Sequence, residues 1–476
     1  MPEFIALPEW MPDQLELGNV LVDADNVMAF ANGYAPVGQF SSVSDTLPDS
    51  FLGGGSFIST DGSAYLLAGG AAGLYRAASG AWSSLITGLS VTKRWRFKQF
   101  GNFAITVNGT ADTRQVDLSS GAQSVIADAP GGIDLAVIGG TNGGHVFIAQ
   151  PDGAQLDVAW SALNDRAGWT PGTDQSGQET MITGGEVMGL AGGEYGVILQ
   201  RSRLVRVDST GNSDAPFSFS EITDNYGCAS TASIVQAGRS VFFLSDRGFM
   251  SLEDGQALTP IGNEKFDRHF RETVPRADWE KIYAAVDPRR TIVIWAMPGN
   301  PGKAWVYNWA LGRATTITTG FDAVFSGYES AIDLDALDAI YGDLDSIPYS
   351  LDDARFQGGS PSMYVVKDAQ LGLFAGTPLQ AYIKQGQAGS GDKRLRLRAM
   401  WPEIDATSGV TCTVEARQRM GDIVSETVSG AMQASGRVPL RAAGKYFTPG
   451  FTIDAGTDWN LFTGYRLEAT PSGVRT

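Results

Sequence analysis

Aspartates are the residues whose spacing most invites chemistry in this chain. Seven of them fall between residues 331 and 353, in the stretch IDLDALDAIYGDLDSIPYSLDD that starts at Ile332. Carboxylate oxygens are the ligands that calcium prefers, so a metal site is one hypothesis. An EF-hand loop, however, needs a glycine at its sixth position and a glutamate at its twelfth, and neither falls into place here. We therefore interpret the stretch as a solvated acidic face that caps a short helix, and we expect no bound metal.

The histidines and cysteines do not form a catalytic or metal-binding pattern. His145 follows a glycine pair at the start of a strand, and His269 lies in a short helical stretch. No serine stands in a GxSxG turn, so we find no basis for a catalytic triad. Cys228 and Cys412 are far apart and lack zinc-ligand spacing, which predicts two buried free thiols. We expect no catalytic residues, no cofactor and no enzymatic activity.

The overall charge excludes one class of function. The 476 residues include 52 acidic and 35 basic side chains, for a net charge of −17. Such a chain does not attract a phosphate backbone by bulk electrostatics, so we exclude specific nucleic-acid binding. No apolar run approaches the length of about 18 residues that spans a membrane, and no secretory leader opens the chain. We therefore expect a protein that is made in a reducing compartment and is not inserted in a membrane.

The elements that position these residues form a repeat. The chain contains 59 glycines and only 18% charged residues, a balance typical of all-β proteins with tight turns. From Ser56 to about Thr318, a unit of three strands and glycine or Asp-Pro turns recurs with starts near residues 56, 95, 135, 187, 233 and 282. A period of about 40–50 residues is typical of β-propeller blades. A large β-sandwich or a β-solenoid is the alternative.

The ends of the repeat suggest how a ring would close. The strands expected in Ser362–Gly376 can pair with strands near the N-terminus, which would remove the exposed edges of an open array. We therefore predict an all-β fold, a β-propeller of six or seven blades closed by N-terminal strands, with a C-terminal β-sandwich. The predicted parts are an extended arm with closing strands at 1–50, the propeller at 51–376 and the sandwich at 377–476. Within the propeller we expect a helical insertion near 263–280 and an acidic junction at 331–359.

The N-terminal arm carries the candidate contact residues. Phe4, Trp10 and Met11 are too apolar for a disordered leader, and Pro8 and Pro12 favour an extended path. The three side chains should dock either on this chain or on a neighbouring copy. Because they would be exposed in a single copy, we predict that they form an interaction site.

Several stretches of the chain resemble one family of virus proteins. They are LPEWMPDQ, NGYAPV, WSALNDRAGWTPG, SVFFLSDRGFMSL, IGNEKFDRHF, LDALDAIYGDLDSIPYSLDDARFQGG and GKYFTPGFTIDAGTDWNLFTGYRLEATPSGVR. In this order they resemble the tail nozzle proteins of short-tailed bacteriophages, which are also described as tail hub or packaged-DNA stabilisation proteins. The matching stretches extend from residue 7 to residue 475, so the resemblance covers almost the whole chain.

The resemblance implies a structural role in the virion. It implies a homohexameric ring below the portal and adaptor proteins, in contact with other tail components such as fibres or a needle. Double-stranded DNA would pass through the ring without specific binding, and the ring would help to retain and then release the genome. The protein would be assembled in the host cytoplasm and end in the phage tail. The candidate residues to line the channel are Asp333, Asp335, Asp338, Asp343 and Asp345, because acidic walls repel a duplex.

A second function class stays open from the sequence. A carbohydrate-binding or glycan-processing β-propeller, such as a lectin or a receptor-binding tail component, could use some of the eleven tryptophans as platforms for sugar rings. A lectin of this kind would behave as a single copy near 50.5 kDa, whereas a ring would be far larger.

Overall fold

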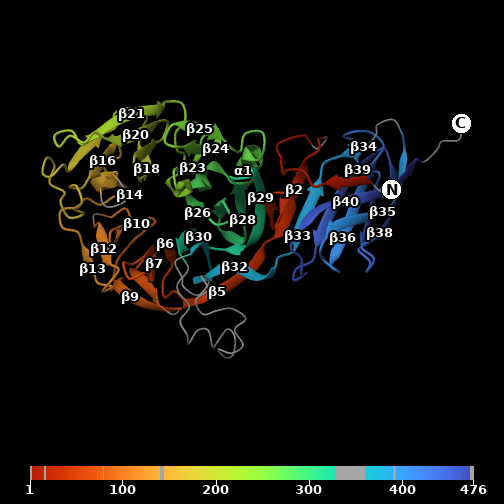
Figure 1. The fold of residues 1–476 in the computed structure, drawn as a ribbon, viewed down its shortest axis with the longest axis horizontal. Coiled ribbons are helices and arrows are strands. Elements are labelled where there is room, and N and C mark those ends of the chain that lie inside the picture. Colours follow the sequence, from red (N-terminus) through yellow and green to blue (C-terminus); the bar gives the residue numbers. More distant parts are fainter. Residues whose placement is uncertain are drawn as a thin grey trace.

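The computed structural model consists of two β-rich parts joined side by side (Figure 1). It describes residues 3–15, 18–78, 80–110, 112–139, 144–328, 360–389 and 393–471. A ring of sheets lies on the left of Figure 1, and a stack of two sheets lies on the right, where both ends of the chain are found. The predicted all-β fold class is confirmed.

The ring is a β-propeller whose blades are four-stranded antiparallel sheets. Blade one contains β6 (Phe51–Ile58), β7 (Ala64–Gly70), β8 (Gly73–Ala78) and β9 (Ala81–Thr87). Blade two contains β10 (Arg96–Phe100), β11 (Phe103–Val107), β12 (Arg114–Asp117) and β13 (Gln123–Val125). Blade three contains β14 (Asp134–Ile138), β15 (His145–Ala149), β16 (Asp157–Trp160) and β17 (Gly177–Thr180), with a 3-10 turn, η1 (Pro151–Gly153), between β15 and β16.

The next three blades repeat the pattern. Blade four contains β18 (Val187–Ala191), β19 (Gly196–Gln200), β20 (Leu204–Ser209) and β21 (Phe217–Thr223). Blade five follows a 3-10 turn, η2 (Thr231–Ser233), with β22 (Val235–Ala237), β23 (Ser240–Ser245), β24 (Gly248–Glu253) and β25 (Ala257–Pro260). Blade six contains β26 (Tyr283–Asp287), β27 (Ile292–Met297), β28 (Gly299–Asn308) and β29 (Arg313–Phe321).

Blade seven closes the ring with a strand from the N-terminus. Its strands are β30 (Ala323–Tyr328), β31 (Pro361–Lys367), β32 (Gln370–Pro378) and β5 (Gly38–Thr46). The outer strand β5 runs antiparallel to β32, with Ser41 opposite Leu373. In the part of the chain that the structure describes, the propeller therefore has seven blades, and the predicted closure by an N-terminal strand is confirmed.

The hydrophobic pattern explains why the blades stack. Inner and middle strands such as β15 (HVFIA) and β19 (GVILQ) are buried at every position, as expected for strands covered on both faces. Each of the seven interfaces between neighbouring blades has a buried apolar cluster, including that between blades seven and one, where Phe325 and Tyr364 pack against Leu66. A closed ring thereby buries faces that a row of blades would leave exposed.

The second part is a β-sandwich. One sheet has the order β3 (Val27–Phe30), β4 (Gly33–Pro36), β40 (Phe462–Pro471), β35 (Leu395–Ile404) and β38 (Val438–Gly444), and β1 (Glu3–Ala6) also pairs with β40. The facing sheet contains β2 (Leu21–Asp25), β33 (Ala381–Gln385), β39 (Tyr446–Ile453), β36 (Val410–Arg417) and β37 (Glu426–Ala431), with β34 (Ala388–Gly389) on β39. Phe451 of the second sheet meets Phe462 and Tyr465 of the first at ring distances of 5.0 and 5.2 Å.

The N-terminal residues do not form an arm separate from the two parts. β1, β3 and β4 are strands of the sandwich, and β2 joins the sandwich to the propeller. Asp25 of β2 pairs in parallel with Thr316 of β29 in blade six, while Asp23 of β2 lies opposite Lys384 of β33. The second sandwich sheet and blade six therefore form one continuous ten-stranded sheet. β3 and β4 form an antiparallel hairpin, with Phe30 opposite Gly33.

The helical insertion lies between blades five and six, as predicted. It consists of α1 (Asp267–Thr273) and a 3-10 helix, η3 (Arg276–Lys281), separated by Pro275. The acidic stretch 331–359 lies outside the described residues. Its flanking strands β30 and β31 pair with each other, with Tyr328 opposite Pro361, so both belong to blade seven. The chain thus enters and leaves the stretch within one blade and not at the border between the two parts.

Closure of the ring leaves no space for a side chain at one glycine, Gly372. A Cβ atom at Gly372 of β32 would lie 2.3 Å from the Ser41 carbonyl oxygen and 2.4 Å from the Phe40 ring of β5. Gly372→Ala should lower the free energy of unfolding by about 1–3 kcal/mol, because the closing strand must shift. Urea denaturation measures the effect. The control is Gly18→Ala, since a Cβ there has no neighbour within 3.8 Å; equal stability of the two variants would contradict the close approach of β5 and β32.

Candidate functional site

The three predicted contact residues lie in different surroundings. Phe4 on β1 is 50% exposed, and its ring covers Gly464 of β40. Met11 is half-buried. Trp10 is only 1% exposed, so the expectation that it is exposed in a single copy is wrong. The physical reason is that the segment around Trp10 packs against the helical insertion of its own chain.

Trp10 fills the space between the N-terminal segment and α1. Its ring stacks on Phe266 at 6.0 Å and meets His269 edge-on at 5.3 Å. The next strand pair adds to this contact, because the Tyr34 hydroxyl donates a hydrogen bond of 2.7 Å to the carbonyl oxygen of Pro8. Aromatic pairs of this kind contribute beyond their buried area. The packing therefore fixes the N-terminal segment on the propeller.

Asp13 of the N-terminal segment caps the start of helix α1. Its two carboxylate oxygens accept hydrogen bonds from the backbone N–H groups of Arg268 and His269, at 2.7 and 2.8 Å. The residue before the helix, Phe266, has no side chain that can do this. The first N–H groups of a helix lack partners within the helix, so a carboxylate from elsewhere satisfies them. An ion pair of 2.7 Å between Glu9 and Lys265 lies beside the cap.

Asp267 ties α1 to blade five. Its carboxylate accepts a hydrogen bond of 3.0 Å from the backbone N–H of Phe249 in β24. Cβ atoms at Gly248 and Gly262 would lie 1.9 and 2.0 Å from its oxygens, so only glycine leaves room for the carboxylate. Burial raises the pKa of Asp267 to about 6.

His269 is held between hydrogen-bond donors. Its Nδ1 accepts a hydrogen bond of 3.3 Å from the Trp305 indole, and the Lys303 ammonium lies 3.4 Å from Nε2. Burial, with the positive charge of Lys303 as a second cause, lowers the pKa of His269 to about 4, against the opposing effect of Asp13 and Asp25. A proton on Nδ1 would also displace the Trp305 hydrogen bond. His269 is therefore neutral near pH 7.

We call the contacts of Trp10, Asp13, Phe266, Asp267 and His269 the α1 junction. Four stretches that carry the family resemblance meet at it. LPEWMPDQ supplies Trp10 and Asp13, IGNEKFDRHF supplies the helix, SVFFLSDRGFMSL supplies Phe249, and NGYAPV supplies Tyr34. Residues that are far apart in the sequence thus form one structural unit.

The other predicted site residues are not described. Asp333, Asp335, Asp338, Asp343 and Asp345 lie in the stretch outside the described residues. Their proposed place on a channel wall stays a prediction.

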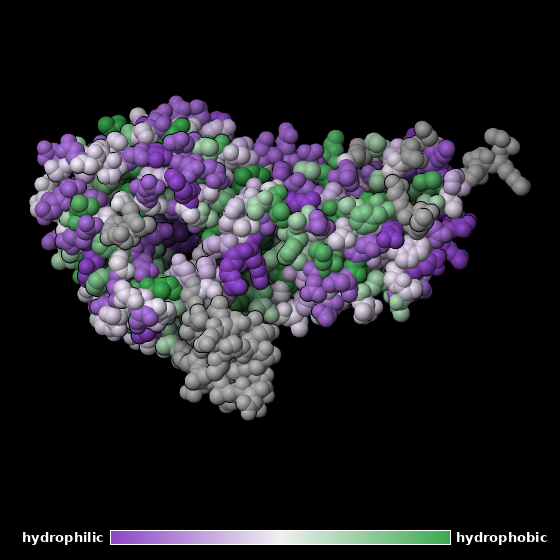
Figure 2. Space-filling view, viewed as in Figure 1, coloured by the Kyte–Doolittle hydropathy of each residue, from purple (hydrophilic) through white to green (hydrophobic). Residues whose placement is uncertain are grey.

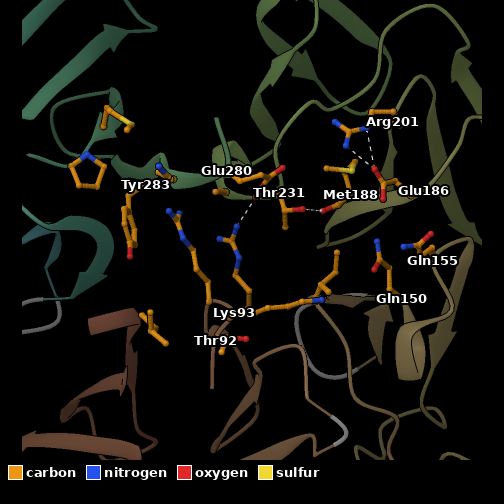
Figure 3. A pocket seen from close by; sticks show the side chains of 18 of the residues that line it. Thr92, Lys93, Gln150, Gln155, Glu186, Met188, Arg201, Thr231, Glu280 and Tyr283 are labelled. Atoms are coloured by element: carbon orange, nitrogen blue, oxygen red, sulfur yellow. Dashed lines mark hydrogen bonds and ion pairs between the residues drawn. The ribbon is translucent and has the colours of Figure 1, made fainter. Parts of the chain in front are cut away.

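A cavity on the propeller axis was not predicted from the sequence. Its volume is about 750 Å³, and its lining residues come from each of the seven blades or from the loop before the blade. Figure 2 shows a hollow with hydrophilic residues in the middle of the propeller, and Figure 3 shows side chains that converge on the cavity from several blades. Its charged lining residues are Lys93, Arg94, Arg96, Glu186, Arg201, Glu280, Lys281 and Asp322.

Two arginines of blade two reach across this axial cavity. Arg94 donates a hydrogen bond to the carbonyl oxygen of Ile282, before blade six, and its guanidinium lies 3.6 Å from the centre of the Tyr283 ring. Arg96 donates a hydrogen bond to the carbonyl oxygen of Thr231, before blade five. Blades five and six each lie three blades away from blade two around the ring. The two side chains therefore brace opposite sides of the propeller.

Burial in the cavity disfavours the charged form of the Arg94 side chain. Burial lowers the pKa of Arg94 to about 10, so the guanidinium stays charged at pH 7. The side chain of Lys98, two residues after Arg96 on β10, lines a smaller cavity together with Arg96 and Asp134. Burial also lowers the pKa of Lys98. A sequence signal was available for this site, because the run KRWRFK (Lys93–Lys98) places four cations within six residues of an acidic chain.

The histidines, cysteines and acidic side chains of the described residues form no metal centre of a familiar kind. No group of three or more His, Cys, Asp and Glu side chains in this part of the chain is arranged to hold a metal ion. His145 is buried, with Nδ1 2.7 Å from the carbonyl oxygen of Ser161 and its ring against Phe217. Cys228 and Cys412 are buried free thiols, as predicted. Across the residues that the structure describes, no helix is long and apolar enough to span a membrane.

Comparisons with known proteins give no family. No family model matches the chain, and no curated protein matches its sequence. Among solved structures, the extracellular domain of a hybrid two-component system from B. thetaiotaomicron is similar over 79% of this chain and 45% of that chain, with 9% identity and a TM-score of 0.43. This chain thus spans less than half of that protein.

Two further similar structures are smaller proteins. BamB from Moraxella catarrhalis is similar over 73% of this chain and 92% of that chain, with 11% identity and a TM-score of 0.37. The β-propeller domain of Cps50 (Swd1) from Myceliophteria thermophila is similar over 60% of this chain and 92% of that chain, with 8% identity and a TM-score of 0.39. At such low identities and scores, these similarities carry no inference about function.

The burial of Trp10 gives a first prediction for the α1 junction. Trp10→Ala should lower the free energy of unfolding by about 3–5 kcal/mol, because it removes a large buried side chain from a packed core. Thermal or urea denaturation of the purified protein measures this loss. Leu15→Ala is the control, since Leu15 is 76% exposed and its removal should change stability by at most about 0.5 kcal/mol. A Trp10→Ala protein as stable as the control would show that the segment does not dock on α1.

The depressed pKa of His269 gives a second prediction. The unfolded chain holds the histidine proton with a pKa near 6.5 and the folded chain with a pKa of about 4, so acid favours unfolding between these values. The stability of the wild type should therefore fall by up to about 3 kcal/mol from pH 7 to pH 4, relative to His269→Gln. Denaturation curves of both proteins at several pH values give this difference. Stability that changes with pH in the same way in both proteins would contradict this prediction. Asp267 has the opposite effect on stability, but it is present in both proteins and so cancels in the difference.

Proposed function

We propose that the protein is a non-enzymatic structural component of a bacteriophage tail. Copies of the chain would assemble into a ring that continues the DNA exit channel below the portal and adaptor proteins. The ring would help to retain the packaged genome and then release it. This proposal rests on the resemblance to tail nozzle proteins, which implies a ring of six copies and contacts with other tail components.

The observation that supports the proposal best is the α1 junction. A ring subunit must hold its contact surfaces at a fixed angle, so that successive copies close the ring and do not form an open helix. The continuous ten-stranded sheet joins the propeller to the sandwich, and Trp10 and Asp13 lock the N-terminal segment onto α1. Four of the stretches that resemble the nozzle family thus contribute contacts that keep the subunit rigid.

The acidic charge agrees with a channel through which DNA slides. Phosphates held by lysine or arginine on a channel wall would slow the duplex, whereas carboxylates repel it over a Debye length of about 8 Å at physiological salt. The surplus of acidic side chains gives a net charge of −17. We propose that Asp333, Asp335, Asp338, Asp343 and Asp345 face the lumen of the ring.

A carbohydrate-binding propeller is the alternative function, and the tryptophans argue against it. Sugar-binding platforms need exposed aromatic faces. Eight of the eleven tryptophans are buried, and the other three, Trp82, Trp309 and Trp401, are half-buried. No specific observation therefore favours a glycan-binding role.

The mass of the particle in solution tests the proposal. Six copies of 50.5 kDa have a mass of about 300 kDa, which mass photometry of the purified protein resolves from a single copy. We expect particles of this mass, and rings in negatively stained electron micrographs.

A surface variant sharpens this test. Phe4→Ser should reduce the ring fraction if the exposed Phe4 side chain packs against a neighbouring copy. Ile182→Ser is the matched control, because it removes a side chain that is 83% exposed in the loop between blades three and four. Particles of 50.5 kDa alone, both in solution and in material recovered from virions, would exclude a ring.

A further inference from the structure

We propose that the axial cavity of the propeller binds a small multivalent oxyanion, a compound that carries several phosphate or carboxylate groups. This site is separate from the assembly proposed above. The charges that line the cavity, the partners of its arginines and its volume support such a site.

The lining of the cavity is basic although the chain is acidic. Five cationic side chains line it, namely Lys93, Arg94, Arg96, Arg201 and Lys281, against the three acids Glu186, Glu280 and Asp322. The whole chain has 17 more acids than bases, so an excess of cations at the axis is opposite in sign to the rest of the protein. Low-dielectric walls strengthen the field of such a cluster at the centre of the cavity.

The arginines are held in place by neutral partners. Arg94 bonds the carbonyl oxygen of Ile282 and stacks on Tyr283, and Arg96 bonds the carbonyl oxygen of Thr231. A carbonyl oxygen orients a guanidinium but does not neutralise it. Each guanidinium has five N–H groups, so donors remain for an anion. Arg96 also forms a long ion pair with Asp134, whose carboxylate oxygen lies 4.0 Å from its Nε.

Two of the acids in the cavity already have hydrogen-bond partners. Glu186 forms an ion pair of 2.7 Å with Arg201, as Figure 3 shows. Glu280 accepts a hydrogen bond of 3.3 Å from the Ser230 hydroxyl, and burial raises its pKa. Lys281 is paired with Asp278 at 2.6 Å, outside the cavity lining. Among the described residues, Lys93 and Arg94 therefore form no ion pair, and Arg96 forms only the long pair with Asp134.

Lys93 completes the site from the rim. It lines both the axial cavity and the smaller cavity beside it, and its side chain lies over Gly109. Within the described residues, it has neither an ion pair nor a hydrogen bond of its side chain. An ammonium on a flexible stem beside two fixed guanidiniums is a suitable arrangement for a ligand with several anionic groups.

The volume of the cavity sets the size of the ligand. A space of about 750 Å³ lies in the range of sites for small molecules. Arg94 and Arg96 cross the axis at this point, so an extended polymer would have to displace them. A compact compound with two or more phosphates or carboxylates fits the cavity without breaking either brace.

Calorimetric titration of the full chain tests this site. Tripolyphosphate is the phosphate probe and citrate the carboxylate probe, and sodium chloride of equal ionic strength corrects for screening. We expect saturable binding of at least one probe, weakened at higher salt. Lys93→Gln and Arg96→Gln should each weaken that binding about tenfold or more, because each removes a charge-assisted hydrogen bond.

The control variant is Arg398→Gln, which makes the same charge change on the exposed face of β35 in the sandwich. Its affinity for the probe should equal that of the wild type. Lys93→Gln decides the test if Arg96→Gln does not fold, since Lys93 holds no other element in place. The proposal is overturned if neither probe binds beyond the chloride control, or if Lys93→Gln binds as tightly as Arg398→Gln.

Discussion

The docking of the N-terminal segment on helix α1 is the constraint on which the rest of the structure depends. Trp10 has its large ring buried against Phe266 and His269, and Asp13 satisfies the free N–H groups at the start of the helix. Directly after this docked segment, β2 lies between β29 of blade six and β33 of the sandwich. The first 46 residues thus place strands in the sandwich, in the joining sheet and in the closing blade. One covalent segment ties all these parts together.

Periodicity in the sequence was sufficient to predict the propeller but not its attachments. Strands such as HVFIA and GVILQ, separated by glycine turns, predict blades because both the pattern and its period are local. The pairing of the last propeller strand with an N-terminal strand could also be predicted, because a ring requires one closing strand. The position of β2 between β29 and β33 could not be predicted, because the pairing of strands that are distant in the sequence depends on the whole fold. For the same reason Trp10 was expected on the surface, since its partner Phe266 is 256 residues away in the sequence.

The axial cavity shows a second limit of sequence reasoning. The run KRWRFK is visible in the sequence, but a strand alternates its side chains, so some cations of such a run can face solvent. Only the closed ring shows that Arg94 and Arg96 point across the axis to blades six and five. Their carbonyl partners leave the positive charge in place, and this charge distinguishes the cavity from an ordinary packed channel. The structure thus combines a brace and an electrostatic site in the same two side chains.

We infer that the α1 junction makes propeller and sandwich one cooperative body. Native-state hydrogen exchange followed by mass spectrometry tests it most directly, because it reports an opening free energy for each segment. We expect β27 in blade six and β39 in the sandwich to open with similar free energies, and Asp13→Ala to lower both together by about 1–2 kcal/mol. If Asp13→Ala leaves the opening free energy of β39 unchanged while that of β27 falls, the two parts are independent and the claim is wrong.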